Sequence, residues 1–304
     1  MNATSHGKFT LNQLPKLLKK AFIAWNADHP FRLSAVVAYY AILSLPALLV
    51  IIINSIGAIW GIDIVQGKLT EEFTVILGKE GAATIESMIR ETQQGNNSVI
   101  STLIGIGTLI FGATGVFYHL QISLNTIWKI SHTKNHSFWQ MVTDRARSFI
   151  FILVIGFLLL VSFILTAGIS ILTKFIRQVF PDIVLYFAFI FDFALSFAVI
   201  TVLFALLFKY LPNAKIQWRT VWLGAILTAI LFVIGKFLLG LYFGQANLDS
   251  TYGAAGTLVL LLLWVSYSCL ILFYGAKFTY VYAEAYGKGI SAKQPNLPGK
   301  KERP

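Results

Sequence analysis

Long stretches without charge divide this sequence and predict how the chain is organised. Asp, Glu, Lys and Arg are absent from residues 33–62, 92–128, 148–173, 193–208, 220–235 and 250–276. A helix needs about 20 mostly apolar residues to cross the hydrocarbon core of a bilayer. We therefore predict an all-α, polytopic membrane bundle. Its six transmembrane helices are expected over 33–58, 99–123, 148–173, 183–208, 218–241 and 254–280.

The composition excludes a soluble globular protein. Hydrophobic residues make up 57% of the chain and charged residues only 12%, whereas soluble domains carry about 25% charged residues. The net charge of +11 requires no nucleic acid as a partner, because it follows mostly from membrane topology, with attraction to anionic headgroups added. The lipid bilayer is therefore the first expected partner.

The positive charges also predict the orientation. Most of the 24 Lys and Arg residues lie in the N-terminal arm, in the loops after the second and fourth spans, and in the C-terminal tail. Because Lys and Arg favour cytoplasmic loops, both termini are predicted to be cytoplasmic. The chain then divides into a cytoplasmic arm (1–32), a membrane domain (33–283) and a basic cytoplasmic tail (284–304), which is expected to be disordered.

Two regions outside the spans carry amphipathic patterns. Residues 11–25 place apolar side chains opposite lysines, which predicts a helix that lies on the cytoplasmic membrane surface or packs on the cytoplasmic loops. These side chains are Leu14, Leu17, Leu18 and Phe22 on one face and Lys16, Lys19 and Lys20 on the other. The loop 62–97 contains two further short amphipathic patterns and is predicted to form a small helical external cap.

Small residues follow one face of the second predicted span. Ser101, Gly105, Thr108, Gly112, Gly115 and His119 recur three or four positions apart, and this spacing places them on one side of a helix. One interpretation is a packing seam, because small residues let membrane helices approach closely. The other is that this face lines a polar pathway, to which His119 would contribute.

Besides Arg219 at the start of the fifth span, three charged residues lie inside predicted spans. Asp192 is about 14 Å from the outer end of its span at ~1.5 Å per residue, where a carboxylate costs on the order of 3 kcal/mol. Lys236 in the next span is a candidate ion-pair partner, while Lys277 is close enough to the cytoplasmic end to reach headgroups unaided. We predict that Asp192 and Lys236 pair, as a structural tether or as part of a transport pathway.

Other motifs have weaker implications. Pro46 removes a backbone hydrogen bond and is expected to kink the first span. Gly240 and Gly244 form a small-xxx-small pair that would suit contacts within a subunit or in a homo-oligomer. His132 and His136 lack a neighbouring carboxylate or thiol that would complete a metal site. We find no nucleotide-binding or nucleophile-elbow motif and expect no metal and no cofactor.

Several stretches together resemble the YihY/virulence factor BrkB family of bacterial inner-membrane proteins. They are "AVVAYYAILSLPALLVI" (35–51), "LGKEGAATIESMI" (77–89), "GATGVFYHLQISLNTIWKI" (112–130), "IGKFLLGLYFG" (234–244) and "YGAAGTLVLLLLWVSYSCLILFYGAKF" (252–278). Their order and spacing make the resemblance specific over about residues 30–285. Asn125 and Lys236 match the family's pattern, and Asn125 is therefore a further intramembrane polar candidate.

The resemblance implies a six-helix fold in the bacterial inner membrane, but no established reaction. One position departs from the pattern: where the family usually reads Gly-Ala-Glu, this chain has Gly275, Ala276 and Lys277. A role of that glutamate therefore does not transfer. Family members were once labelled as ribonuclease BN, but this sequence contains no carboxylate or histidine cluster suited to metal-assisted cleavage of RNA.

Three functions remain as hypotheses. The first is a secondary transporter or permease for a small solute or an envelope lipid component, with Asp192, Lys236 and His119 along the pathway. The alternative is a non-transporting membrane scaffold or assembly factor of the cell envelope. An enzyme is the least favoured, because no convergent catalytic set is visible.

Overall fold

A computed structural model describes residues 10–44, 115–130, 181–245 and 256–292, together with isolated positions between 61 and 90. The chain begins with a short 3-10 helix, η1 (Leu11–Gln13), and α1 (Leu14–Ala27). A helix over Pro30–Ser44 and another over 115–127 follow. Three long helices complete the described part: α6 (Pro181–Tyr210), α7 (Trp218–Gln245) and α9 (Gly256–Tyr286).

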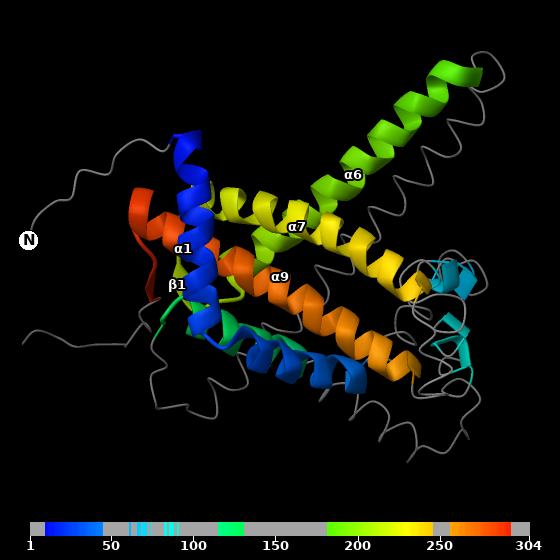
Figure 1. Cartoon of the computed structure of the whole chain (residues 1–304), viewed down its shortest axis with the longest axis horizontal. Helices are drawn as coiled ribbons and strands as arrows, with labels where there is room; N and C mark the ends of the chain where they lie inside the picture. The colour runs from blue at the N-terminus through cyan, green and yellow to red at the C-terminus, as the bar shows by residue number, and fades with distance from the viewer. Residues whose placement is uncertain are drawn as a thin grey trace, which may run out of the picture.

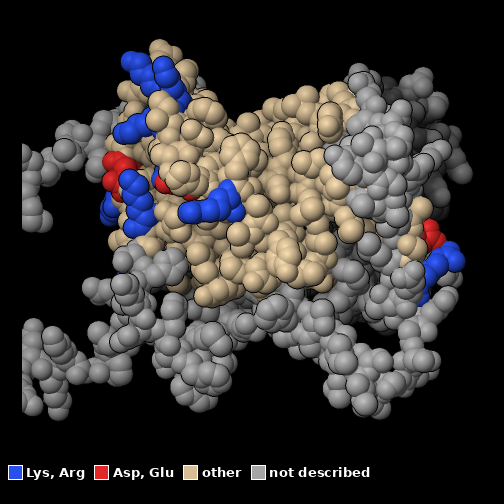
Figure 2. All heavy atoms as spheres, turned by 60° about the horizontal axis from the view of Figure 1, so that its bottom comes forward, with Lys and Arg blue, Asp and Glu red and all other residues tan. Residues whose placement is uncertain are grey.

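The long helices are membrane helices by length and composition. Within the described part of the chain, three segments are long and apolar enough to cross a bilayer: Phe193–Tyr210, Trp218–Tyr242 and Leu258–Tyr286. They overlap the predicted spans 183–208, 218–241 and 254–280, with the first beginning ten residues later than predicted and the third ending six residues later. Figure 2 shows a broad uncharged band between charged groups at either end of the described surface, as expected for a protein embedded in lipid.

The first three predicted spans are described only in part. The helix over Pro30–Ser44 begins the first span and the helix over 115–127 ends the second. The third span lies outside the described residues, and so do Pro46, Gly105 and Gly112. The number of six spans and the orientation of the termini therefore stay predictions.

The arrangement of α1, α6, α7 and α9 is visible in Figure 1. α7 and α9 run side by side, while α6 contacts α7 near its own C-terminal end and diverges from it toward its N-terminus. α1 crosses the C-terminal part of α9. Leu17 and Ala21 of α1 are buried there against Phe278, Val281 and Tyr282 of α9. The sequence predicted a helix on the membrane surface or on the cytoplasmic loops; its packing on the last turns of α9 was not predicted.

The predicted tail begins too early. α9 continues to Tyr286, because its last turns pack against α1: the Tyr286 hydroxyl donates to Gln13 Oε1 at 2.7 Å. Beyond it, β2 (Ser291–Ala292) pairs antiparallel with β1 (Ala214–Lys215), which lies in the connection between α6 and α7. The first part of the segment predicted to be disordered is thus tied to the membrane domain.

Two reciprocal glycine–threonine contacts set the close approach of α7 and α9. Thr279 of α9 lies over Gly224 of α7, and Thr228 of α7 lies over Gly275 of α9, so closely that a Cβ on either glycine would overlap the threonine hydroxyl. Each hydroxyl donates to the carbonyl four residues earlier in its own helix, Thr228 to Gly224 at 2.6 Å and Thr279 to Gly275 at 2.7 Å. The buried hydroxyls are therefore satisfied, and the missing Cβ atoms allow tight packing.

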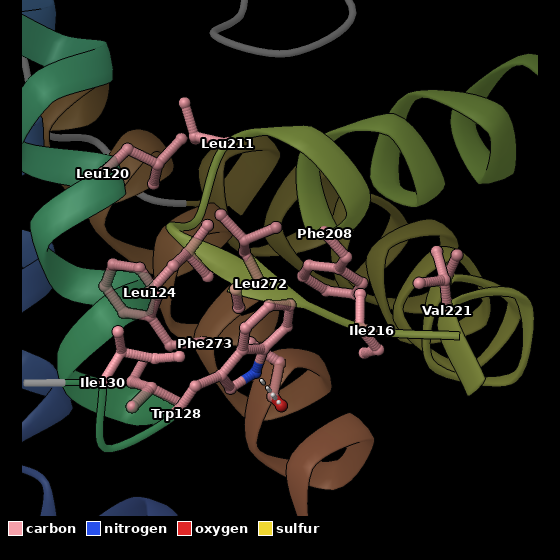
Figure 3. Close-up of a cluster of buried hydrophobic side chains, with 14 of the residues drawn as sticks. Leu120, Leu124, Trp128, Ile130, Phe208, Leu211, Ile216, Val221, Leu272 and Phe273 are labelled. Atoms are coloured by element: carbon pink, nitrogen blue, oxygen red, sulfur yellow. Dashed lines mark hydrogen bonds between the residues drawn. The ribbon is translucent and has the colours of Figure 1, made fainter. Parts of the chain in front are cut away.

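A cluster of large apolar side chains packs where the helix over 115–127, the ends of α6 and α7, and α9 meet. Leu124, Trp128, Phe208 and Phe273 are fully buried in it (Figure 3). Trp128 also donates its indole N–H to the carbonyl of Ala276 at 2.8 Å. Because this cluster joins residues 115–130 to both α6 and α9, it holds these three segments together at the end of the bundle where α1 lies.

The glycine–threonine packing predicts that Gly275→Ala destabilises the protein. The added methyl would overlap Thr228, and overpacking of this kind costs about 1–3 kcal/mol. The free energy of unfolding in detergent micelles should fall by that amount. Thr228→Ala in the same chain should restore part of it, because it removes the overlapping hydroxyl.

Gly67→Ala is the matched control, since nothing lies within 4 Å of a Cβ added there. Equal stability of the Gly275→Ala and Gly67→Ala proteins would show that the α7–α9 crossing does not depend on the small residue.

Candidate functional site

Lys277 lies at the meeting point of three segments that are far apart in the sequence. Its side chain is only 1% exposed, and its Nζ is 2.6 Å from Asp28 Oδ2. The same ammonium donates to the carbonyl of Ile127 at 2.8 Å and lies 5.1 Å from the ring centroid of Tyr280. Asp28 follows α1 directly, and Ile127 is the last residue of the helix over 115–127.

Each contact of Lys277 has a physical reason. A buried ammonium must be paired and hydrogen-bonded, because its desolvation is otherwise too costly. Asp28 supplies the opposite charge. The carbonyl of Ile127 is at a helix C-terminus, where the helix dipole favours a cation, and the ring of Tyr280 adds a cation–π contact. The ammonium is therefore enclosed and neutralised, which suits a structural link better than a site for a ligand.

This environment differs from the one predicted for Lys277. The sequence placed it close enough to the cytoplasmic end to reach headgroups unaided, but the structure turns its side chain inward to Asp28. Sequence reasoning missed Asp28, although one signal was present: it is the only acidic residue before Asp63. Among the described residues, Trp25 Nε1 and Asp28 Oδ2 are both buried without a hydrogen-bond partner, so Asp28 Oδ2 meets Lys277 through the ion pair and not through a well-directed hydrogen bond.

Asn125 and Gln121 hold the connection between α6 and α7. Asn125 Oδ1 accepts a hydrogen bond from the backbone N–H of Asn213 at 2.9 Å, and Gln121 Nε2 donates to the carbonyl of Leu211 at 2.8 Å. Both side chains are buried. Asn125, predicted as an intramembrane polar residue, thus satisfies backbone groups that would otherwise be buried without a partner.

His119 and Gly115 face the helix over Pro30–Ser44. The imidazole stacks on the ring of Tyr40 with centroids 4.4 Å apart and planes at 21°. One turn earlier, a Cβ on Gly115 would lie 2.5 Å from Tyr40 Cδ1. At these two positions the small face of the second span is a packing surface, with His119 as an aromatic partner of Tyr40.

Lys236 occupies a different environment, at a hollow between α7 and α9. Phe232, Lys236 and Leu239 line it from α7, and Trp264, Tyr267, Ser268 and Ile271 line it from α9. The hollow holds about 170 Å³ of empty space and is open to the outside, with no inner chamber wide enough for a water molecule. Lys236 is exposed. Of the two lysines in these helices, Lys236 is the exposed one and Lys277 the buried one.

Asp192 lies on α6, and its side chain is outside the described part of the structure. Phe204 of α6 contacts Phe232 of α7 with ring centroids 5.6 Å apart. From this contact, Asp192 is about 18 Å away along α6 and Lys236 about 6 Å away along α7 in the same direction, at ~1.5 Å per residue. Asp192 therefore lies about 12 Å beyond the level of Lys236, at ~1.5 Å per residue, on the part of α6 that diverges from α7 (Figure 1). The direct pair of Asp192 with Lys236 stays a prediction, and in this arrangement it would require α6 to approach α7.

Metal ligands do not gather in the described regions: no three His, Cys, Asp or Glu side chains come together there. Cys269, the single cysteine, is buried in α9 as a free thiol.

The chain matches one described family along most of its length. The model of the family "Virulence factor BrkB" covers residues 21–299. A relative named UPF0761 membrane protein from Verminephrobacter eiseniae is 29% identical over 58% of this chain and 40% of its own length. Proteins with the same printed family name from Mannheimia succiniciproducens and Aeromonas salmonicida are 28% identical over 68% of each chain, and 23% identical over 89% of this chain and 91% of the relative.

Some of these relatives are much longer than the matched region: the chain spans less than half the length of the V. eiseniae protein and of a similar protein from Delftia acidovorans. No solved structure matches the chain.

The enclosure of Lys277 predicts a large effect of removing its counter-charge. Asp28→Asn leaves an uncompensated buried ammonium and should lower the free energy of unfolding in detergent by about 3–5 kcal/mol. The double variant Asp28→Asn/Lys277→Met should lose less than the single variant, because no unpaired charge then remains.

Glu86→Gln provides the matched control. It breaks the Glu86–Arg90 pair, which is equally short at 2.6 Å but solvent-exposed, and exposed pairs contribute at most about 1 kcal/mol. If Asp28→Asn cost no more than Glu86→Gln, the pair with Lys277 would not hold these segments together.

Proposed function

We propose that this protein is a secondary transporter or permease. Two observations support the proposal: the chain belongs to the Virulence factor BrkB family of membrane proteins, and a lysine lies at a hollow between its membrane helices. Its substrate would be a small solute or an envelope lipid component. Charged residues within membrane helices commonly mark substrate or ion pathways. The observation that carries the proposal is the contrast between enclosed Lys277 and exposed Lys236.

The proposed topology has six transmembrane helices with both termini on the cytoplasmic side of the bacterial inner membrane. Three apolar helices of sufficient length support the membrane domain, and the distribution of Lys and Arg supports the orientation. No enzymatic reaction is part of the proposal. Movement of substrate would be driven by its own gradient or by a coupled ion.

The proposed pathway runs between α6 and α7. α6 is packed against α7 toward one end and diverges toward the other (Figure 1), while α7 and α9 are locked together by the two glycine–threonine contacts. An approach of α6 would bring Asp192 toward Lys236, so that a carboxylate and an ammonium could neutralise each other in one state and separate in the other. Such a pair would couple the movement of a proton to that of substrate.

The second candidate is a non-transporting scaffold or assembly factor of the cell envelope. The packing around Lys277 favours it, because this charge is buried and pairs with Asp28 between segments of the fold. Under this alternative the external loop 62–97 and the termini would bind partners. Crosslinking in cells would then yield a stoichiometric partner that is lost when 62–97 is deleted.

Transport can be measured with purified protein in liposomes, using a panel of small solutes under an imposed proton gradient and fluorescent phospholipids. We expect flux above protein-free vesicles, and a decrease of about tenfold in Asp192→Asn and Lys236→Gln, the effect of losing one charge-assisted interaction. Glu86→Gln should retain the flux. No flux across the whole panel would remove the transport proposal.

The orientation can be tested with cysteines introduced one at a time. The single cysteine, Cys269, is first replaced in Cys269→Ala; Ser5→Cys then reports on the N-terminal arm and Gln94→Cys on the loop 62–97. A membrane-impermeant maleimide added to spheroplasts should label the loop cysteine and should label the arm cysteine only after lysis. The reverse labelling would overturn the cytoplasmic placement of the N-terminus.

A further inference from the structure

The direction of α1 bears on how this helix meets the membrane. Figure 1 shows α1 lying across the C-terminal part of α9 and not along it, and the two helices are in contact. α9 contains a segment that is long and apolar enough to cross a bilayer, Leu258–Tyr286. A helix that lies across a membrane-spanning helix runs along the membrane plane. α1 therefore has the direction of an interfacial helix.

The contacts between α7 and α9 place α1 at the level of an exposed tryptophan. Gly224 of α7 faces Thr279 of α9, and the second glycine–threonine contact shows that the two helices run in opposite directions. Trp222, just before Gly224, is therefore level with Val281, just after Thr279. Val281 is buried against α1, while the indole of Trp222 is exposed. Because exposed tryptophans on membrane helices mark the bilayer interface, α1 lies at the depth of that interface.

Aromatic rings lie on the side of α1 that is directed toward the membrane interior. Phe22 and Trp25 contact Tyr274 of α9 with ring centroids 6.5 and 6.0 Å apart, and Tyr274 is closer to the middle of α9 than the residues that bury Leu17. Trp25 also contacts Phe31, near the start of the helix over Pro30–Ser44, at 6.1 Å. Phe22 is 55% exposed and Phe31 64%. These two rings are therefore available to insert among acyl chains.

Lysines lie on the sides of α1 that face away from α9. Lys16, Lys19 and Lys20 are exposed, whereas Leu17 and Ala21 are buried against α9. One helix thus uses separate sides for the protein and for its surroundings, with ammonium groups on the outer side. Long lysine side chains at this depth reach the headgroup layer.

The charge around α1 is positive. Among the described residues at this end of the bundle, the acidic side chains are Asp28 and Glu284, and Asp28 is already paired with Lys277. Figure 2 shows basic side chains gathered at the same end of the described surface. An anionic surface therefore matches the outer side of α1.

We propose that α1 is an in-plane helix that binds anionic phospholipid headgroups through Lys16, Lys19 and Lys20, with the ring of Phe22 inserted below them. The negative potential of the cytoplasmic leaflet attracts basic segments, and the proposed topology puts α1 at that leaflet. An acidic protein would match the same charge, but the exposed rings and the level of the α7 tryptophan favour the bilayer. The inference does not rest on transport, since it concerns how the protein is held in the membrane.

The lipids around α1 can be identified by fluorescence quenching in liposomes. Ile23, which is exposed on the same side as the lysines, is changed in Cys269→Ala/Ile23→Cys and labelled with bimane. Phosphatidylglycerol and phosphatidylcholine carry a nitroxide on the same acyl chain. A nitroxide near the headgroup should quench more than one near the chain end. Labelled phosphatidylglycerol should quench as if enriched about fivefold over phosphatidylcholine, the effect of about one lysine near an anionic surface.

The triple variant Lys16→Gln/Lys19→Gln/Lys20→Gln should remove this enrichment. Quenching by phosphatidylcholine should stay unchanged in it, which shows that α1 keeps its place without the lysines. Added salt should weaken the enrichment in the unmodified helix, because salt screens exposed charges.

Lys288→Gln is the matched control for the single variant Lys19→Gln, because it removes an exposed lysine at the same end of the bundle but outside α1. Lys19→Gln should lower the enrichment and Lys288→Gln should not. Equal quenching by the two lipids, enrichment that survives the triple variant, or an equal loss in Lys288→Gln would each overturn the proposed headgroup binding. Absence of quenching by either lipid would place α1 off the bilayer and make an acidic protein its partner, which would overturn it as well.

Discussion

The buried ammonium of Lys277 constrains the arrangement of the segments around it. It contacts Asp28 after α1, the carbonyl that ends the helix over 115–127, and Tyr280 on its own helix. Because a charge with 1% exposure is tolerated only with close partners, these segments cannot separate without leaving an unpaired charge. Trp128 adds a second link at the same level through the carbonyl of Ala276. The end of the bundle at which α1 lies is therefore held by polar contacts and apolar packing together.

The two lysines in α7 and α9 illustrate how environment determines what one side-chain type does in a membrane. Lys277 has its charge neutralised by protein groups and stabilises the fold. Lys236 is exposed at a hollow that the aromatic side chains of Phe232, Trp264 and Tyr267 line. The charge of Lys277 is thus enclosed by protein groups, whereas the side chain of Lys236 lies at the surface of the helix pair. Composition alone assigns the same cost to both residues; only burial and partners separate their roles.

The sequence predicted α6, α7 and α9 well because the requirement for a long uncharged stretch is local: it depends on residues within one segment. It did not predict the pair of Asp28 with Lys277, which join the N-terminal arm to the last long helix, nor the contacts of Gly224 with Thr279 and of Thr228 with Gly275. These depend on which helix faces meet and at what level, and helical periodicity within one segment does not contain that information. Asn125 was identified as an intramembrane polar residue, but its partner in the α6–α7 connection was not.

The difference between the packing of α9 and that of α6 on α7 gives the proposed transporter a physical basis. α7 and α9 approach closely at two glycines, each covered by a threonine of the other helix, so sliding them apart would break these close van der Waals contacts. α6 contacts α7 mainly through apolar and aromatic groups such as Phe204 and Phe232. Apolar contacts can be exchanged for contacts with acyl chains at little cost, because lipid is as apolar as the side chains it would replace. In the proposed transporter, Lys236 thus lies on the tightly packed pair, and α6 is the element that would approach it.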